Sequence, residues 1–365
     1  MGAEQTNLYV PNLVGKRVAL VVNHTSVIRN HQGSVTHLAD SLQQLGVNLT
    51  LIFAPEHGFR GTASAGEHVA NGVDTKTKLP LISLYGSNKK PTASQLKDID
   101  VVIFDIQDVG ARFYTYISTM HYVMEACAEN NKEFIVLDRP NPNGHYVDGP
   151  VLEKAFSSFV GLNPIPVVHG CTVGELATLI NGEGWLKNGV RCNLSVVTCA
   201  NYRHNQRYSP PIAPSPNLPN LQSILLYPSL CLFEGTDVSV GRGTDTQFQV
   251  IGSPVVRPNA YTFTPEDKVG AVNPMHEGKK CYGLNLTTID AKQQGFTLKY
   301  LLDFYQKSPD KTKFFTTPAF FDKLAGTDTL RKQILAGKTE SQIRKQWTTA
   351  LNQYKQIRAK YLLYE

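Results

Sequence analysis

Long hydrophobic runs and a strong excess of one charge are both missing from this sequence. No stretch of about 18 consecutive apolar residues occurs, so we predict no membrane-spanning helix. The formal net charge is +6 over 365 residues, and lysine and arginine are scattered rather than gathered beside aromatic residues. A nucleic-acid-binding surface is therefore not predicted, whereas an anionic small molecule or polymer is compatible with this charge.

Cysteine is scarce and follows no metal-binding pattern. The six cysteines are Cys127, Cys171, Cys192, Cys199, Cys231 and Cys281. They contain no CxxC pair and no zinc-ligand spacing, so we predict no metal site. We expect most of them to be small apolar residues of the core, with one or two disulfides as the alternative.

Motifs of several common enzyme classes are also absent. The sequence has no GxGxxG after its first predicted strand, no GxxxxGKS/T, no GxSxG and no HExxH. We therefore expect no nicotinamide or other cofactor, no ATP site and no serine-hydrolase elbow. Acid and base catalysis by carboxylates is the leading enzymatic chemistry that remains.

Short apolar runs alternate with helix-length segments over the first 200 residues. The predicted strands are 17–22, 49–54, 81–85, 101–106, 133–138 and 194–200, and the predicted helices are 36–45, 116–130 and 173–181. Nearly continuous apolar strands with helices between them are typical of a parallel sheet that is buried on both faces. We predict an α/β fold with a Rossmann-like parallel sheet and helices on both of its faces.

A proline-rich segment, SPPIAPSPNLPN at 209–220, can form neither a helix nor a central strand. Because 365 residues exceed the usual size of a single core, we predict two domains. These are a Rossmann-like catalytic domain at 1–205 and a smaller α+β domain at 206–365 that completes a cleft. In the second domain we predict a strand at 283–290 and helices at 298–307, 329–336 and 341–361.

Polar residues follow the predicted strands of the sheet. In open parallel sheets, ligands bind beyond the carboxyl ends of the strands, so these residues are candidates for a catalytic and substrate-binding site. The candidates are Asn23, His24, Glu56, His57, Asp105, Asp108, Arg112, Tyr114 and Arg139. The alternative for each of them is a helix cap or a contact that stabilises a loop.

The segment APEHGFRG at 54–61 contains our first choice for a catalytic acid. Pro55 fixes the exit from the strand and Gly58 permits a sharp turn, which brings Glu56 and His57 into a crevice. Partial shielding by neighbouring phenylalanines would raise the pKa of the Glu56 carboxyl, as a general acid requires. The alternative is a carboxylate that only stabilises the loop, and a histidine beside glycine often binds backbone.

Arginine and a second carboxylate occur in two further segments of the first domain. In FDIQDVGARFYTY at 104–116, Arg112 can bind either a substrate carboxylate or Asp108. In HGCTVGELATLI at 169–180, Thr172 and Glu175 form a capping box that opens an apolar helix. Glu175 is also a candidate for a second catalytic carboxylate, because His169 lies beside it.

The segment FEGTDVSVGRGTDTQF at 233–248 combines Glu234 and Arg242 with three glycines. We predict a loop that faces the cleft, because the glycines allow the backbone to approach a ligand closely. Arg242 can then hold an anionic group of the substrate. A tight structural turn is the alternative.

Together, these motifs resemble one family, the bacterial exo-β-N-acetylmuramidases, long catalogued only as a domain of unknown function. The segments that carry the resemblance are PEHGFRG, SLYG, DIQDVGARFYTY, VLDRPNP, HGCTVGEL, PSPNLPN, EGTDVSVGRGT and YLLY. The resemblance implies a Rossmann-like domain and a smaller domain around a cleft. It also implies release of terminal N-acetylmuramic acid from the non-reducing end of peptidoglycan-derived muropeptides or disaccharides, without NAD.

The resemblance further implies site residues and a location. It supports Glu56 most strongly and Glu175 less so. Asp105, Asp108, Glu234 and Asp237 stay open as the second carboxylate, and Arg112, Arg139 or Arg242 can bind the lactyl carboxylate of muramic acid. Such proteins are usually exported, so we expect a periplasmic or secreted protein whose signal peptide has been removed.

Two departures from the family pattern and two other functions are also considered. Asp237 stands where the pattern has asparagine, and Cys171 where it has methionine.

A non-catalytic protein that binds murein fragments would need only cations and neutral hydrogen-bonding groups in the cleft. A metal-dependent hydrolase would use His24, Glu56, His57 and Asp105 as ligands.

Overall fold

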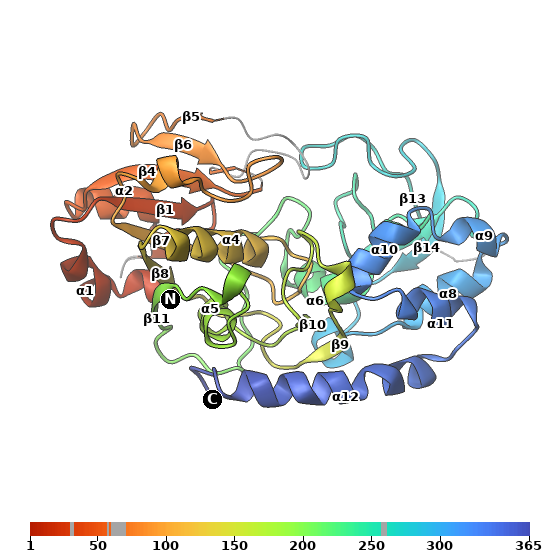
Figure 1. The fold of residues 1–365 in the computed structure, drawn as a ribbon. Helices are drawn as coiled ribbons and strands as arrows, with labels where there is room; N and C mark the ends of the chain where they lie inside the picture. The colour runs from red at the N-terminus through yellow and green to blue at the C-terminus, as the bar shows by residue number, and fades with distance from the viewer. Residues whose placement is uncertain (30–32, 57, 60–70, 257–260) are drawn as a thin grey trace.

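Two lobes lie side by side in the computed structural model, which describes residues 1–29, 33–56, 58–59, 71–256 and 261–365 (Figure 1). The larger lobe is built on a seven-stranded sheet. In spatial order, its strands are β11 (Asn193–Val197), β8 (Glu133–Leu137), β7 (Val101–Asp105), β1 (Val18–Val22), β4 (Leu49–Ala54), β6 (Pro80–Ser83) and β5 (Gly72–Val73). All neighbouring strands run parallel except the edge pair of β5 and β6.

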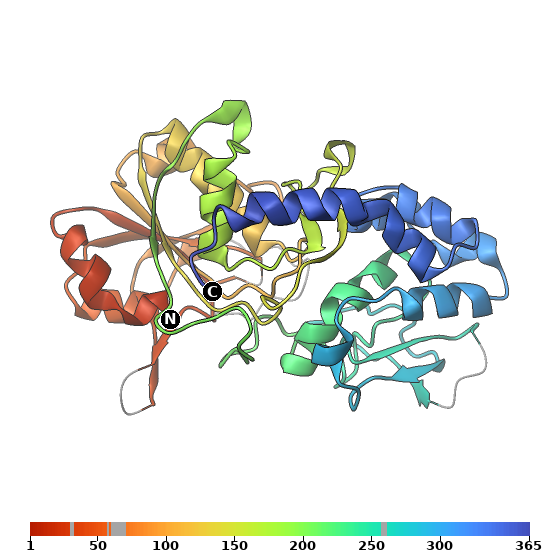
Figure 2. The same ribbon diagram turned by 90° about the horizontal axis from the view of Figure 1, so that it is seen from below.

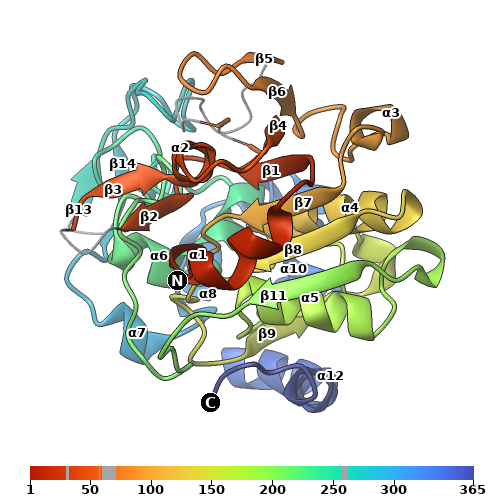
Figure 3. The same cartoon turned by 90° about the vertical axis from the view of Figure 1, so that its left-hand side faces the viewer.

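The sheet is covered by helices on both faces, because its strands are apolar on both sides. The helices of this lobe are α1 (Thr6–Tyr9), α2 (Leu38–Gln44), α3 (Ala93–Leu96), α4 (Tyr116–Glu129) and α5 (Val173–Gly182). Alternate residues of a strand point to opposite faces. On β1, Ala19 and Val21 join the core beneath α4 and α5, whereas Leu20 and Val22 join the core beneath α2 (Figure 3). The predicted Rossmann-like architecture is confirmed.

The predicted strands agree with the observed ones to within a few residues, but the segment 36–45 differs. Its first residues belong to β3 (Val35–His37), which pairs with β2 (Val27–Arg29) in a separate antiparallel hairpin. The helix α2 begins only at Leu38, because the His37 side chain caps it by accepting a hydrogen bond from the Ala39 amide at 3.2 Å. β-branched residues before the cap favour the extended conformation.

The smaller lobe consists of helices around a three-stranded antiparallel sheet, in the order β12 (Val250–Ser253), β14 (Cys281–Asn285) and β13 (Tyr261–Phe263). Its helices are α6 (Leu221–Leu230), α7 (Ala291–Gln294), α8 (Lys299–Lys307), α9 (Lys311–Phe314), α10 (Pro318–Ala325) and α11 (Thr329–Leu335). The predicted α+β class of this part of the chain is confirmed. Four helices of this lobe were not predicted, namely α6, α7, α9 and α10. Helix α6 begins two residues after Pro219 and α10 begins at Pro318.

The last helix, α12 (Glu340–Ala359), runs back from the smaller lobe to the larger one (Figure 2). It packs on β9 (Asp148–Val151), which forms a hairpin with β10 (Pro166–Val168). The tail beyond α12 then reaches the end of the large sheet, where the Tyr364 hydroxyl donates to the Asp138 carboxylate at 2.6 Å. The C-terminus of the chain therefore completes the first lobe.

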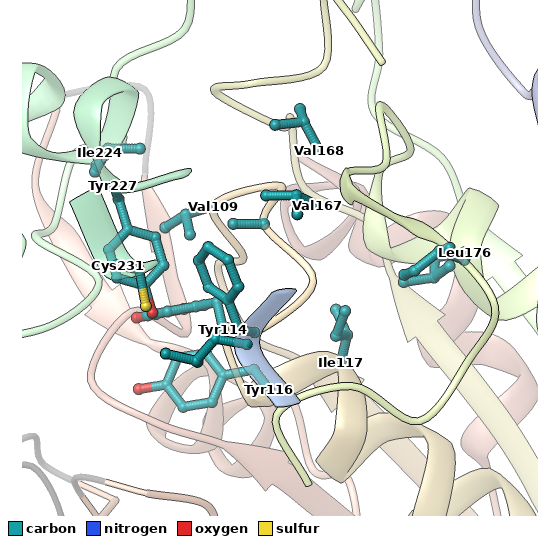
Figure 4. Packing of buried hydrophobic residues seen from close by; sticks show 14 of the residues in the cluster. Val109, Tyr114, Tyr116, Ile117, Val167, Val168, Leu176, Ile224, Tyr227 and Cys231 are labelled. Atoms are coloured by element: carbon teal, nitrogen blue, oxygen red, sulfur yellow. The ribbon is translucent and has the colours of Figure 1, made fainter. Parts of the chain in front are cut away.

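A shared core holds the two lobes together. Tyr114 and Tyr116 come from the loop and helix after β7, and they face Tyr227 and Cys231 of the smaller lobe (Figure 4). The rings of Tyr114 and Tyr227 meet edge to face with centroids 5.9 Å apart, a favourable geometry for aromatic pairs. Because this packing is continuous, the groups on both sides of the junction have fixed relative positions.

All six cysteines are buried and present as free thiols, which confirms that they are residues of the core. Burial raises the pKa of the Cys192 and Cys281 thiols to about 12, so these thiols are inert at neutral pH. In the part of the chain that the structure describes, no helix has the length and apolar character needed to cross a membrane.

Candidate active site

A cavity of about 280 Å³ lies where the two lobes meet. From the larger lobe it is lined by Glu56, Tyr85, Phe113, Tyr114, Thr115 and Tyr116. From the smaller lobe it is lined by Tyr227, Cys231, Glu234, Arg242, Phe248 and Phe320. Apolar walls with a few converging polar groups are typical of small-molecule sites.

Glu56 follows β4 and Pro55 and lies in the wall of this cavity. Its Oε2 atom accepts a hydrogen bond from the Thr115 hydroxyl at 2.8 Å, which fixes the direction of the carboxyl group. Burial, and after it the negative charge of Glu56, raises the pKa of the Tyr85 phenol, so Tyr85 is a hydrogen-bond donor at neutral pH. Glu56 is thus a half-buried carboxyl that two hydroxyl groups hold at the edge of the cavity.

Glu234 and Arg242 form a salt bridge in the part of the cavity that belongs to the smaller lobe. The Glu234 Oε1 atom accepts from Nε of Arg242 at 2.9 Å and from Nη2 at 2.6 Å. The two side chains are 23% and 28% exposed, so a ligand in the cavity can reach them. Although burial alone would lower the pKa of Arg242, Glu234 raises it, and the guanidinium also lies 5.1 Å from the centre of the Phe248 ring.

Tyr114 lines the cavity but uses its hydroxyl elsewhere. The hydroxyl donates to the Pro214 carbonyl at 2.8 Å and thereby fastens the proline-rich segment to the loop after β7. Ser215 and Asn217 of that segment also line the cavity. No residue of this segment was among the predicted site residues, although PSPNLPN carries part of the family resemblance. Hydrogen-bonding residues placed between prolines that fix a turn were the signal that could have identified them.

Asp105 and Arg139 lie at the ends of β7 and β8, where sequence reasoning placed a catalytic carboxylate and a substrate cation. The structure instead pairs them with each other: Nη2 of Arg139 donates to Oδ2 of Asp105 at 2.8 Å, and both side chains are almost completely inaccessible to solvent. Asn23 turns inward, where its Oδ1 accepts from the Thr25 amide at 2.9 Å. The crevice between β1 and β7, which binds ligands in many such sheets, is therefore filled by side chains.

Arg112 and Asp108 also differ from their predicted contacts. The Arg112 guanidinium is fully buried and donates to three backbone carbonyls, so it contacts neither the cavity nor Asp108. Asp108 accepts a hydrogen bond from the Gly110 amide at 2.6 Å and lies 3.7 Å from Nε2 of His169. His169 is buried and accepts from the Cys171 amide through Nδ1, which leaves the ring proton on Nε2, facing Asp108. Both side chains serve loop structure.

Glu175 is fully buried outside the cavity and forms the capping box that its sequence indicates. Its Oε2 accepts from the Thr172 amide at 2.9 Å, and its Oε1 accepts from the Leu363 amide at 2.9 Å and lies 2.9 Å from Nε2 of His204. A carboxylate with all of these partners and no solvent contact cannot reach a glycosidic oxygen. The geometry therefore supports the structural alternative for Glu175.

A metal-dependent hydrolase would need His24 among its ligands at the strand ends. Nε2 of His24 lies 2.8 Å from the Ala213 carbonyl, and His57 lies outside the described residues. Within the residues that the structure describes, no group of three or more His, Cys, Asp or Glu side chains converges as metal ligands would. Asp105 faces Arg139 rather than Glu56.

Comparisons with known proteins agree with this architecture. Residues 18–222 match the family model described as Exo-beta-N-acetylmuramidase NamZ, N-terminal, and residues 225–364 match its C-terminal counterpart. The peptidoglycan beta-N-acetylmuramidase NamZ of Bacillus subtilis strain 168 is 39% identical over 98% of this chain and 89% of its own length.

Two crystal structures from Bacteroides fragilis NCTC 9343, both titled DUF1343 family proteins, have the same fold. One is 46% identical with a TM-score of 0.91, and the other is 31% identical with a TM-score of 0.84. Each alignment covers 100% of this chain and 98% of the solved chain. The chain therefore belongs to the exo-β-N-acetylmuramidase family.

Proposed function

We propose that this chain is a glycoside hydrolase that releases terminal N-acetylmuramic acid from the non-reducing end of peptidoglycan fragments, with Glu56 as the proton donor. One observation carries this assignment of the site. Glu56 and Glu234 are the two carboxylates that line the cavity in the described part of the chain, and they come from different lobes. Glycoside hydrolysis commonly requires two such groups on either side of the scissile bond.

Glu56 is suited to protonate the glycosidic oxygen. Thr115 and Tyr85 hold its carboxyl group in place, so that no reorganisation is needed when the proton is transferred. The apolar rings that line the cavity would strengthen charge interactions when a bound sugar displaces water from it. Glu234 is then the second carboxylate, whose charge stabilises the positive charge that develops on the sugar ring. It acts either as a nucleophile on that ring or as the base that activates water.

Arg242 is suited to recognise the lactyl carboxylate that distinguishes muramic acid from glucosamine. Among the three predicted arginines, Arg242 lines the cavity, whereas Arg112 and Arg139 are buried in other contacts. Its Nε and Nη2 atoms are held by Glu234, which orients the planar guanidinium before substrate binds. A fixed guanidinium discriminates strongly against a substrate that lacks its carboxylate partner.

The substrates are muropeptides or disaccharides derived from peptidoglycan, and we propose that the protein acts outside the cytoplasm, where such fragments are released. Fractionation of cells that express the full-length gene product tests this location. Recovery of the mature protein in the periplasm or medium is expected. Recovery in the cytoplasm alone would contradict it.

The activity is tested with two substrates, the disaccharide MurNAc-β-1,4-GlcNAc and para-nitrophenyl N-acetylmuramic acid, with the N-acetylglucosamine analogue and EDTA as controls. Wild type is expected to hydrolyse both muramic substrates with and without EDTA. Glu56→Gln is expected to lose about 10³-fold in kcat on the disaccharide, and less on the aryl glycoside, because para-nitrophenolate leaves with little protonation. A folded wild type that binds N-acetylmuramic acid but releases nothing would favour the binding-protein alternative.

A further inference from the structure

Arg112 is a buried cation whose described hydrogen-bond partners are all backbone carbonyls. Its Nη1 donates to the carbonyls of Pro150 and Ile165 at 2.8 Å each, and its Nη2 donates to the carbonyl of Leu324 at 2.9 Å. Burial without a carboxylate lowers the pKa of Arg112 to about 9. A buried charge of this kind is costly, so a neutral side chain would serve better if packing alone were required.

The three carbonyls belong to segments from both lobes. Pro150 lies in β9 and Ile165 directly precedes β10, whereas Leu324 lies in α10 of the smaller lobe. Helix α10 contributes Phe320 and Leu324 to the cavity wall. Arg112 itself precedes Phe113, Tyr114 and Thr115, which line the cavity from the larger lobe. One planar guanidinium thus joins segments of both lobes beside the cavity.

Two glycines let the backbone approach this side chain closely. A Cβ atom on Gly326 would lie 2.6 Å from Nη2 of Arg112, and a Cβ atom on Gly161 would lie 3.3 Å from Cδ and Nε. Gly161 ends the turn that carries Phe159 and Val160, which also line the cavity. The turn is closed by reciprocal backbone hydrogen bonds of 2.9 Å between Ser158 and Gly161. The backbone at Gly161 and Gly326 therefore packs closely against two further sides of the Arg112 side chain.

Arg112 is also connected to the proposed proton donor. The residue three positions later is Thr115, whose hydroxyl donates to Glu56 at 2.8 Å. We infer that Arg112 is a positioning residue: by fixing α10, the 158–161 turn and the 113–115 loop against one another, it sets the position of Glu56 relative to the bound glycosidic oxygen. This inference rests on the proposed function, because it assigns Glu56 as the proton donor.

Lysine cannot replace arginine in this role. Its ammonium group carries a point charge and cannot direct a planar fork to three carbonyls in different directions. A displacement of about 1 Å at the reacting groups can reduce a rate by about 100-fold. We therefore expect Arg112→Lys to fold and to bind substrate while transferring the proton poorly.

The test compares kcat and KM of Arg112→Lys on MurNAc-β-1,4-GlcNAc and on para-nitrophenyl N-acetylmuramic acid. The sugar leaving group needs a proton from the acid, whereas para-nitrophenolate needs little help. We expect kcat on the disaccharide to fall about 100-fold and kcat on the aryl glycoside about 10-fold or less, with KM nearly unchanged. A lower folded fraction alone would reduce the rates on both substrates by the same factor. Equal losses on the two substrates would therefore overturn the inference, and so would wild-type rates on both.

Two controls and a second variant keep the result decisive. Arg331→Lys is the matched control, because Arg331 holds α10 through a bidentate bond to Asp322 and does not line the cavity. If Arg112→Lys fails to fold, Gly161→Ala presses a methyl group against Arg112 and leaves the charge in place, with Gly72→Ala, in open space, as its control. Gly161→Ala is expected to show the same leaving-group selectivity to a smaller extent, because Arg112 needs to shift by only a few tenths of an ångström. Equal losses on the two substrates would overturn the inference. A wild type inactive on both substrates would instead refute the proposed function, and with it the inference.

Discussion

Two arginine–carboxylate pairs in this protein have the same chemistry and opposite surroundings. Asp105 and Arg139 are 0% and 1% exposed and fill the crevice at the end of the large sheet. Glu234 and Arg242 are 23% and 28% exposed and line a cavity between the lobes. The first pair has no free surface for a ligand, whereas the second keeps hydrogen-bonding edges for one. Access to the cavity, rather than residue type or position in the fold, separates the structural pair from the pair that we propose to act on the substrate.

The largest effect is expected from breaking the buried pair. Asp105→Asn leaves the Arg139 cation buried without its counter-charge, which should reduce the free energy of unfolding by about 3–5 kcal/mol. Urea unfolding measures this loss. The kcat per folded molecule should remain at the wild-type value, and a large fall in kcat with unchanged stability would show that Asp105 takes part in catalysis after all.

The partly exposed pair, Glu234 and Arg242, should respond in the opposite way: its loss should reduce activity and leave stability nearly unchanged. Glu234→Gln is expected to lower kcat on muramic substrates by about 10²-fold to 10³-fold, because the charge of the second carboxylate is removed. The free energy of unfolding should change by less than about 1 kcal/mol, as for other partly exposed ion pairs. Glu266→Gln, an exposed glutamate in the same lobe, is the control. Full activity of Glu234→Gln would show that Glu234 is not the second catalytic carboxylate.

A substitution at Arg242 tests whether this pair determines substrate specificity. Arg242→Lys keeps the positive charge but loses the planar fork, so kcat/KM on para-nitrophenyl N-acetylmuramic acid should fall about 10-fold to 100-fold. The rate on the N-acetylglucosamine analogue should fall less, because that sugar has no carboxylate and responds only to the loosened contact between Arg242 and Glu234. Arg17→Lys, at an exposed pair with Asp98 and Asp100, is the control. An equal loss on both sugars would show that Arg242 does not recognise the lactyl group.

The smallest effect is expected at Asp138, a buried carboxylate for which the structure describes no contact with a guanidinium group. Burial raises its pKa to about 6, while hydrogen bonds from Tyr364, Thr172 and Gly174 act in the opposite direction. Because the folded-state pKa lies above the ordinary value near 4, the contribution of Asp138 to stability falls as pH rises from about 4 to about 6 and is constant above that range.

Removing the Tyr364 hydroxyl, the strongest of these hydrogen-bond donors, tests the direction of this pH dependence. Tyr364→Phe should lower the free energy of unfolding by about 1–2 kcal/mol at pH 8, where Asp138 is charged, and by less at pH 4. Urea unfolding at both pH values measures the difference. Tyr361→Phe removes a hydroxyl that bonds to Glu183 and serves as the control. A larger loss at pH 4 than at pH 8 would reverse the assignment.

The large sheet could be predicted from the sequence because each of its central strands is a continuous apolar run. Glu56 could be identified for the same reason, since it directly follows such a run and a proline. The pairing of Asp105 with Arg139 could not, because the two residues are 34 positions apart and each alone fits a ligand site equally well. Polar residues at strand ends mark where a crevice forms, but only the three-dimensional structure shows which of them bind one another.

The smaller lobe was harder to predict than the sheet. Helix α6 begins at Leu221, one residue after a proline-rich segment, and contains Pro228, so helical periodicity is interrupted. The same proline-rich segment supplies Ser215 and Asn217 to the cavity, held there by the Tyr114 hydroxyl from a loop 100 residues away. Contacts of this range leave no local pattern in the sequence.

The return of α12 to the larger lobe determines when that lobe can finish folding. Asp138 meets Tyr364 across 226 positions, and Glu175 meets Leu363 across 188. These partners follow the whole smaller lobe in the sequence, so the larger lobe is completed by residues that lie far along the chain from its sheet. Contacts of such long sequence range cost loop-closure entropy, so the larger lobe can complete its structure only when α12 and the segment after it have packed against it.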